Sequence, residues 1–128
     1  MEKKIFVSAA MLGLIAVILG AFASHGLRAN LSVTALESFQ TGVRYQMYHA
    51  FFLFVIGLMP QLQYQQKKRL FWLTLLGVLL FSGSIYLLAT NVLTPIDFGF
   101  LGPITPTGGL LLISAWGLLG VYFFKKKF

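Results

Sequence analysis

Cysteine is absent from this chain of 128 residues, and acidic side chains number only three. Without Cys the chain can form no disulfide, no zinc–thiolate site and no iron–sulfur cluster. Charged residues make up 10% of the chain, whereas a typical soluble domain has about a quarter. Because 58% of the residues are hydrophobic, too little polar surface remains to coat a water-soluble particle. The composition therefore indicates one domain that lies in a lipid bilayer.

The motifs of the common enzyme classes are missing as well. The sequence has no GxSxG, no HExxH, no P-loop and no paired carboxylates. Its two histidines, His25 and His49, fall at different depths of the expected helices, and no carboxylate or Cys completes a ligand set. We therefore expect no metal, no cofactor and no catalytic site.

Four apolar stretches are long enough to cross a membrane, since about 20 helical residues span the roughly 30 Å of hydrocarbon. They predict an all-α, multi-pass membrane protein whose four transmembrane helices pack as a bundle in a single membrane domain, residues 1–128. The predicted spans are about 5–24, 40–59, 70–90 and 107–124, and residues 34–40 are a polar start of the second helix.

The first apolar stretch has two interpretations. Lys3, Lys4, an apolar core and the small residues around position 22 resemble a secretory signal with its cleavage site. The length of the stretch favours a retained helix instead. Small residues that recur along it would let a second helix approach closely, although they are also common in membrane helices in general. These small residues are Ala9, Gly13, Ala16, Gly20 and Ala23.

Local signals predict where the helices begin and end. Gly26 favours an end of the first helix in a left-handed conformation. Thr34 and Glu37 match the capping-box pattern for the start of the second helix. Residues 60–69 and 91–106 are expected to be a basic turn and a loop, and Thr105 with Pro106 is typical of the start of the fourth helix.

Basic residues lie mainly at one set of helix ends. With four spans, eight of the ten fall on the side of the N-terminus, the second connection and the C-terminus. These eight are Lys3, Lys4, Lys67, Lys68, Arg69, Lys125, Lys126 and Lys127. The positive-inside rule then predicts that both termini are cytoplasmic, in a bacterial plasma membrane. Nucleic acid is not an expected partner, because the basic residues flank apolar runs and form no patch.

The second helix, residues 34–59, is polar in its first half and apolar in its second. Unpaired polar groups cost several kcal/mol each in hydrocarbon, so we expect the other helices to cover the polar half. Arg44 either binds a ligand or links helices and head groups as a structural residue. His49 is either a buried neutral side chain or a proton relay. His25 either caps carbonyl groups at the end of the first helix or senses pH.

These side chains define a candidate binding site that opens toward the outer face. Its residues are His25, Glu37, Arg44, Tyr45, Tyr48, His49, Ser84 and Tyr86. A small anionic solute or a lipid head group would be bound or transported there without catalysis. The alternative is a structural or accessory membrane subunit whose polar cluster only stabilises helix packing. Membrane lipid is the expected partner in both cases, together with a second copy of the chain or another membrane protein.

Four stretches, residues 20–27, 39–50, 81–86 and 102–109, carry a resemblance over nearly the whole chain. They are similar to the domain of unknown function 423 family, small membrane proteins that include the eukaryotic transmembrane protein 256. The sequence TGVRYQMYHA at 41–50 is the most specific of them. The first stretch departs slightly, with Ala23 and Ser24 in place of Gly and Ala, and retains His25. The resemblance implies a retained first helix and four spans, and it implies no established activity.

Overall fold

The computed structural model describes residues 1–126, whose regular structure is entirely helical, as predicted. The long helices are α1 (Glu2–Phe22), α2 (Val33–Leu58), α3 (Tyr64–Ala89) and α4 (Ile104–Lys125). A π-helical turn, η1 (Ala23–Leu27), continues α1. Two 3₁₀ turns, η2 (Asn91–Leu93) and η3 (Gly99–Leu101), lie between α3 and α4.

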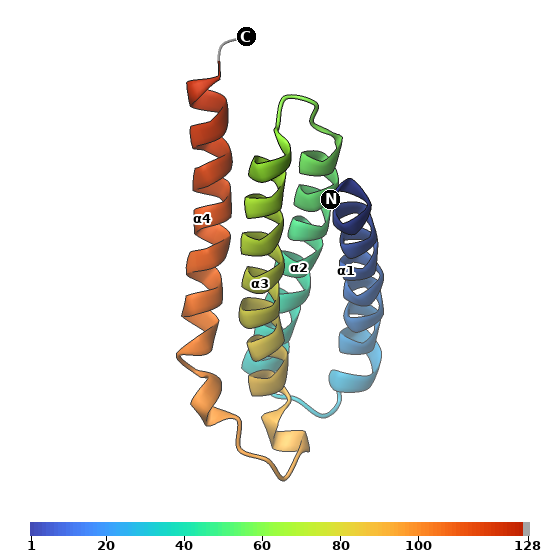
Figure 1. The fold of residues 1–128 in the computed structure, drawn as a ribbon. Helices are drawn as coiled ribbons and strands as arrows, with labels where there is room; N and C mark the ends of the chain where they lie inside the picture. Colours follow the sequence, from blue (N-terminus) through green and yellow to red (C-terminus); the bar gives the residue numbers. More distant parts are fainter. Residues whose placement is uncertain (127–128) are drawn as a thin grey trace.

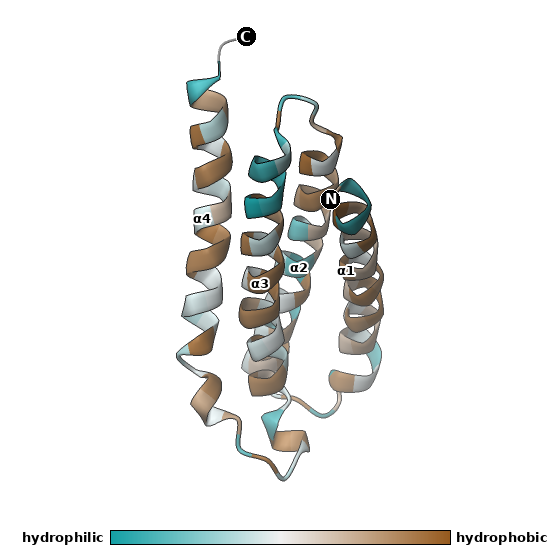
Figure 2. Ribbon diagram, in the orientation of Figure 1, coloured by the Kyte–Doolittle hydropathy of each residue, from teal (hydrophilic) through white to brown (hydrophobic). Residues whose placement is uncertain are grey.

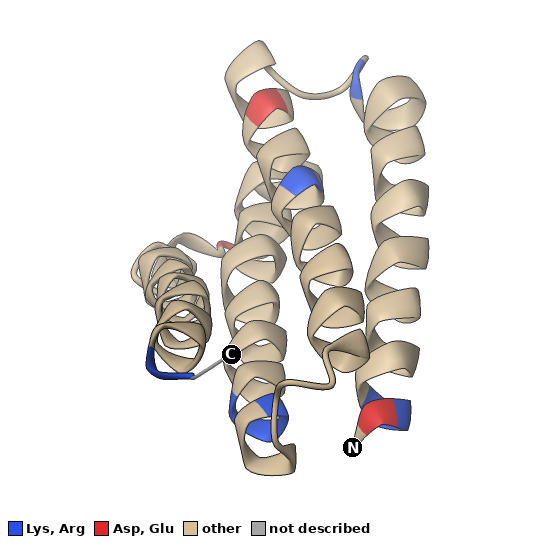
Figure 3. Cartoon of the chain, turned by 90° about the horizontal axis from the view of Figure 1, so that it is seen from above, with Lys and Arg blue, Asp and Glu red and all other residues tan. Residues whose placement is uncertain are grey.

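The four helices run alternately up and down and form an open row (Figure 1). α1 packs on α2, α2 on α3 and α3 on α4, and these sequential pairs hold most of the helix packing. Figure 3 looks nearly along α4 and shows the other helices from the side, so α4 crosses them at an angle. The start of α1, the α2–α3 connection and the end of α4 lie at one end, called here the terminal end. The other two connections lie at the opposite, loop end.

Within the described residues, three helical segments are long and apolar enough to cross a membrane: Glu2–Leu27, Tyr64–Ala89 and Gly99–Lys125. α2 is as long as α3, at 26 residues, but its polar side chains are spread from Thr34 to His49, whereas those in the first half of α3 lie mostly in its first two turns. Hydrophobic residues cover most of α1 and α4 (Figure 2). Large apolar side chains such as Val17, Leu79 and Ile113 face outward. Such a continuous apolar surface is suited to lipid contact.

Small residues bring α1 against α2. Ala9, Ala16 and Ala23 are completely or almost completely buried. A methyl group added at Gly20 would lie 3.5 Å from Val43, which is an ordinary contact distance. The buried alanines of α1 and η1, with the contacts of Gly20, agree with the first interpretation of the small residues, a close approach of a second helix.

Glycines bring α3 against α4 more closely still. A methyl group at Gly108 of α4 would collide with the backbone of Leu80 and Phe81 in α3. One at Gly77 of α3 would lie 2.7 Å from the Leu112 side chain of α4. Both glycines thus mark the crossing point of the two helices.

The helix starts differ from the predictions in detail. α2 begins one residue before Thr34, because the Ser32 hydroxyl caps it by accepting from the Ala35 N–H at 3.1 Å. The capping box predicted at Thr34 is therefore wrong. Gly26 does not take a left-handed conformation, since the chain passes through η1 instead. α4 begins at Ile104 with Pro103 as its N-cap, and the Thr105 hydroxyl bonds another helix.

The predicted turn at 60–69 is half helical. α3 begins at Tyr64, six residues before the predicted span. Gln63 and Gln66 form a reciprocal capping box there, in which the Gln63 N–H donates to Gln66 Oε1 at 2.9 Å. The added turns bring the basic residues at 67–69 onto a helix.

Candidate functional site

A buried polar network joins the first three helices near their middle. Gln46 of α2 is only 4% exposed. Its amide donates to the Leu12 carbonyl of α1 at 2.8 Å, and its carbonyl accepts from the Tyr86 hydroxyl of α3 at 2.6 Å. Nearby, the Ser82 hydroxyl donates to the Gly42 carbonyl of α2 at 2.7 Å. The network uses side chains on two helices to satisfy polar atoms away from water.

His49 joins α2 to α4. Its Nδ1 lies 2.7 Å from the Tyr45 carbonyl, and the Trp116 indole N–H donates to its Nε2 at 3.1 Å. A carbonyl can only accept, so Nδ1 carries the hydrogen and Nε2 is the acceptor. This geometry defines a neutral imidazole in one tautomer. Both ring nitrogens are used, and the hydrogen bond holds the Trp116 ring in place.

The His49–Trp116 groove lies between α2, α3 and α4 beside this pair, and its volume is about 700 Å³. Aromatic side chains and glycines make up much of its lining. The lining residues are Tyr45, His49, Phe81, Gly109, Leu112, Ile113, Trp116 and Gly117. The groove exists because α4 diverges from α2 while it crosses α3.

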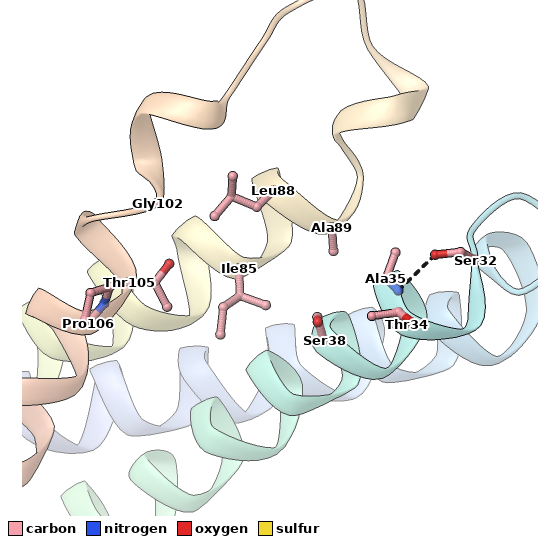
Figure 4. Close-up of a pocket in the computed structure, with 10 residues that line it drawn as sticks. All are labelled: Ser32, Thr34, Ala35, Ser38, Ile85, Leu88, Ala89, Gly102, Thr105 and Pro106. Atoms are coloured by element: carbon pink, nitrogen blue, oxygen red, sulfur yellow. Dashed lines mark hydrogen bonds between the residues drawn. The ribbon is translucent and has the colours of Figure 1, made fainter.

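A second cavity, the end pocket, lies at the loop end and has a volume of about 540 Å³ (Figure 4). The starts of α2 and α4 and the end of α3 surround it. Its lining residues are Ser32, Thr34, Ala35, Ser38, Ile85, Leu88, Ala89, Gly102, Thr105 and Pro106. The walls formed by α2 and α4 carry hydroxyl groups, whereas the wall formed by α3 is apolar.

The hydroxyls of the end pocket differ in their bonding. Ser32 caps α2, and Thr105 shares a hydrogen bond with the buried Ser84 hydroxyl of α3. Neither the Thr34 nor the Ser38 hydroxyl makes a hydrogen bond within residues 1–126. In Figure 4 the Ser38 side chain projects into the space below Ile85. Two free hydroxyls, one helical turn apart, are thus available to a ligand.

The structure does not gather the candidate residues into one site. His25, Glu37, Arg44 and Tyr48 are exposed on the molecular surface. The expectation that other helices cover the polar half of α2 is therefore wrong for that face. The reason is the open row: α1 and α3 cover two faces of α2, and no other part of residues 1–126 covers the face that carries these side chains.

Arg44 bonds within its own helix. Its guanidinium donates to the Thr41 hydroxyl at 3.0 Å, and that hydroxyl donates to the Glu37 carbonyl at 3.0 Å. Of the other candidates, Tyr45 and His49 line the groove, Tyr86 belongs to the Gln46 network and Ser84 touches the end pocket through Thr105. The eight residues thus divide among several places.

Lys67 was not identified from the sequence as a residue that holds helices together. It is 5% exposed, and its ammonium donates to Glu2 Oε1 at 2.8 Å and to the Gly57 carbonyl at 2.9 Å. It thereby joins α1, α2 and α3 at the terminal end. Its spacing to Leu70, Phe71 and Thr74 places it on one buried helical face, which is the signal that could have identified it. Within residues 1–126, no group of three metal-ligating side chains occurs.

Comparison with known proteins identifies the family. The family model described as protein of unknown function (DUF423) matches residues 19–109. The chain belongs to this family. It is 40% identical over 123 residues to the UPF0382 membrane protein SH2409 of Staphylococcus haemolyticus, an alignment that covers 96% of this chain and 97% of that one.

Two further relatives of this DUF423 chain are also named as membrane proteins. Identity is 36% to the UPF0382 membrane protein YwdK of Bacillus subtilis, over 93% of this chain and 94% of the relative. Identity is 34% to the UPF0382 inner membrane protein YgdD of Escherichia coli, in an alignment that covers 98% of this chain and 95% of the relative. No solved structure matches the chain significantly. The names of these relatives and the long apolar helices of this chain together place the protein in the bacterial cell membrane.

Proposed function

We propose that the chain is one membrane domain, residues 1–128, that crosses the plasma membrane four times with both termini in the cytoplasm. The placement of charge supports this. Seven described basic residues lie at the terminal end: Lys3, Lys4, Lys67, Lys68, Arg69, Lys125 and Lys126. Lys127, the eighth of the predicted set, is outside the described residues. Among the described basic residues, only Arg28 and Arg44 lie elsewhere, which supports a cytoplasmic terminal end.

The crossing of α2 requires an account of Arg44. It lies 14 residues before Leu58, or about 21 Å from the cytoplasmic end of the helix. That depth falls in the outer half of the hydrocarbon layer. The long side chain lies on an uncovered face and can extend its guanidinium to the outer head groups. Arg44 thus has a structural role in this arrangement.

In this orientation the end pocket opens to the outer surface, and we propose that it binds a lipid head group. The observation that carries this proposal is its divided lining: hydroxyls on α2 and α4 face an apolar α3 wall. The Thr34 and Ser38 hydroxyls can hydrogen-bond the polar part of a lipid. Ile85 and Leu88 can contact the first part of an acyl chain.

The lining favours a lipid over a free anionic solute. None of the ten lining residues carries a charge. A soluble anion would have to lose its hydration without a cation to replace it, whereas a lipid adds apolar contacts along the α3 wall. The candidate cations Arg44 and His25 do not line the pocket.

Native mass spectrometry of the protein extracted in mild detergent tests this function. The wild-type protein should retain phospholipid. A Thr34→Val, Ser38→Ala double variant should retain several-fold less at an unchanged thermal midpoint. Ser114→Ala is the matched control, because Ser114 is exposed on α4 outside the pocket. Equal retention by the double variant would overturn the proposal, and binding of inorganic phosphate by delipidated protein would indicate a soluble anion instead.

A second candidate, a structural or accessory subunit, rests on the Gln46 network. Its two side chains, Gln46 and Tyr86, are bonded to each other, and Gln46 also bonds the α1 backbone, so neither needs a ligand as a partner. Gln46→Leu removes the acceptor of the Tyr86 hydroxyl and the bond from α2 to the Leu12 carbonyl, so the thermal midpoint should fall. A buried polar group left unpaired costs about 1–3 kcal/mol. Unchanged lipid retention by this variant would separate the network from the end pocket.

A further inference from the structure

The His49–Trp116 groove differs from an ordinary lipid-facing crevice in its lining. Its walls include the rings of Tyr45, Phe81 and Trp116. The Tyr45 and Phe81 rings lie 5.1 Å apart between centroids, and the Trp116 ring packs against Phe52 at 4.6 Å. The faces of such rings are preferred partners for another flat ring system. An acyl chain gains nothing specific from them.

The groove also lies deep in the membrane. His49 precedes the end of α2 at Leu58 by nine residues, and Trp116 precedes Lys125 at the end of α4 by nine residues. Each is therefore about 14 Å from the terminal end, close to the middle of the hydrocarbon layer. Two independent helices give the same depth, and the hydrogen bond between the two residues agrees with it.

One polar atom of the groove has no hydrogen-bond partner within the described residues. Tyr45 is 40% exposed at the groove, and its hydroxyl makes no hydrogen bond within residues 1–126. Tyr45 precedes Leu58 by thirteen residues, so it lies about 20 Å from the terminal end and inside the hydrocarbon layer, where a free hydroxyl is costly. A ligand that dissolves in the membrane and carries a carbonyl oxygen would satisfy it. His49 and Trp116 satisfy each other and act as a rigid wall, which makes His49 a positioning residue.

We propose that this groove binds a membrane-soluble quinone. The flat ring would lie against the three aromatic side chains, and one ring carbonyl would accept from the Tyr45 hydroxyl. The apolar tail would leave through the open side of the groove into lipid. A volume of about 700 Å³ accommodates a substituted ring and the first part of its tail. The proposal concerns binding alone, and it is independent of the end pocket at the loop end.

The two tryptophans of the chain allow a direct test. Trp116 lines the groove and is 53% exposed, while Trp72 lies on α3 outside the groove and is 44% exposed. Quinones quench tryptophan fluorescence on contact. We would reconstitute Trp72→Phe and Trp116→Phe proteins in phospholipid nanodiscs and titrate each with a decyl-substituted benzoquinone. The fluorescence of Trp116, observed in the Trp72→Phe protein, should fall saturably to less than half its starting intensity. The fluorescence of Trp72, observed in the Trp116→Phe protein, should fall only in proportion to the quinone dissolved in the bilayer.

Two glycines of α4 supply a matched pair of further variants in the Trp72→Phe background. A Cβ atom added at Gly117 or at Gly120 meets nothing within 4 Å, so both positions have open space for a larger side chain. Of these two glycines, only Gly117 lines the groove. Gly117→Leu should abolish the saturable quenching, and Gly120→Leu should leave it intact. Tyr45→Phe, which keeps the ring and removes the hydroxyl, should weaken binding by about tenfold, the effect of one hydrogen bond.

Equal, unsaturable quenching of both tryptophans would overturn the proposal, because it would show collision with dissolved quinone only. Saturable quenching that survives Gly117→Leu would also overturn it, since the ring would then lie elsewhere. Lipid retention at the end pocket is read out by mass spectrometry and different residues. Failure of one proposal therefore leaves the other untouched.

Discussion

Lys67 illustrates, at the scale of single residues, how a charge is held within helix packing at a membrane boundary. Its ammonium has two acceptors on two other helices, the Glu2 carboxylate and the Gly57 carbonyl. The carboxylate is largely exposed, so screening weakens its attraction. The carbonyl is the more demanding partner, because Gly57 is buried against Ile5 and Phe6 of α1.

Lys67→Met should therefore lower the thermal midpoint of the protein in detergent. The change keeps the apolar length of the side chain but leaves the Gly57 carbonyl without its donor, at a cost of about 1–3 kcal/mol. Glu2→Gln is the control, because the amide still offers an oxygen and the site is exposed. The midpoints can be measured by circular dichroism. A larger effect from Glu2→Gln than from Lys67→Met would show that the ion pair dominates instead.

Thr74 is the opposite case, a buried polar atom without a partner. It is completely buried in α3, and its hydroxyl oxygen makes no hydrogen bond within residues 1–126. Thr74→Val replaces the hydroxyl by a methyl group of similar shape and removes this uncompensated burial. The variant should gain about 1 kcal/mol, seen as a higher thermal midpoint. Thr107→Val, at an exposed position of α4, should change little. A destabilised Thr74→Val protein would mean that the hydroxyl does have a partner.

The chemistry of single residues was predicted better than their surroundings. His49 was expected to be either a buried neutral side chain or a proton relay, and the structure shows it buried with its ring bonded to the Tyr45 carbonyl. Trp116 was not identified as its second partner, because a contact between residues 67 positions apart leaves no mark in the local pattern. Gln46 was overlooked for the same reason. Its role depends on where Leu12 and Tyr86 lie in space.

At the scale of helices, the α3–α4 crossing depends on Gly108 more than on any apolar side chain. A methyl group there meets the backbone of Leu80 and Phe81, which cannot rotate away as a side chain can. Gly108→Ala should force the helices apart and destabilise the protein by about 1–3 kcal/mol. Gly117→Ala, which meets nothing within 4 Å, should be neutral or stabilising through helix propensity. Thermal midpoints of the two variants check this, and equal midpoints would show that the crossing can relax.

The presence of the helices was predictable because the length of an apolar stretch and the Pro, Gly and polar residues that flank it are local properties of the sequence. Their ends were less so. Thr34 and Ser32 both suit the start of α2, and the choice falls on Ser32, whose hydroxyl meets the Ala35 N–H. Thr105 is diverted from capping by Ser84, a residue 21 positions away. Competition of this kind is settled by tertiary contacts.

The arrangement of the whole molecule was the least predictable level. From the sequence we expected a bundle in which the other helices cover the polar half of α2. The observed row leaves Arg44 and Tyr48 exposed and opens the His49–Trp116 groove beside α4. The glycines at 77 and 108 allow the angled α3–α4 crossing, but no sequence pattern states which of several glycines will be used.

The absence of Cys from the chain makes its topology directly testable. Single cysteines would replace Lys4 and Gln65 at the terminal end, and Arg28 and Asp97 at the loop end, all exposed positions. Intact bacterial spheroplasts would be treated with a membrane-impermeant maleimide. Positions 28 and 97 should react at once, and positions 4 and 65 only after permeabilisation, because the positive-inside rule keeps the basic end in the cytoplasm.

Position 65 decides the most demanding part of this arrangement, the crossing of α2. If the polar half of α2 kept the helix at the outer surface, position 65 would follow position 28 and react in intact spheroplasts. Protection of position 65 requires that α2 carries Gln46 and His49 through the membrane, bonded to α1, α3 and α4. Gln46→Leu should then leave the labelling pattern unchanged while it lowers stability, since insertion follows charge and hydrophobicity and the network acts only after the helices have met.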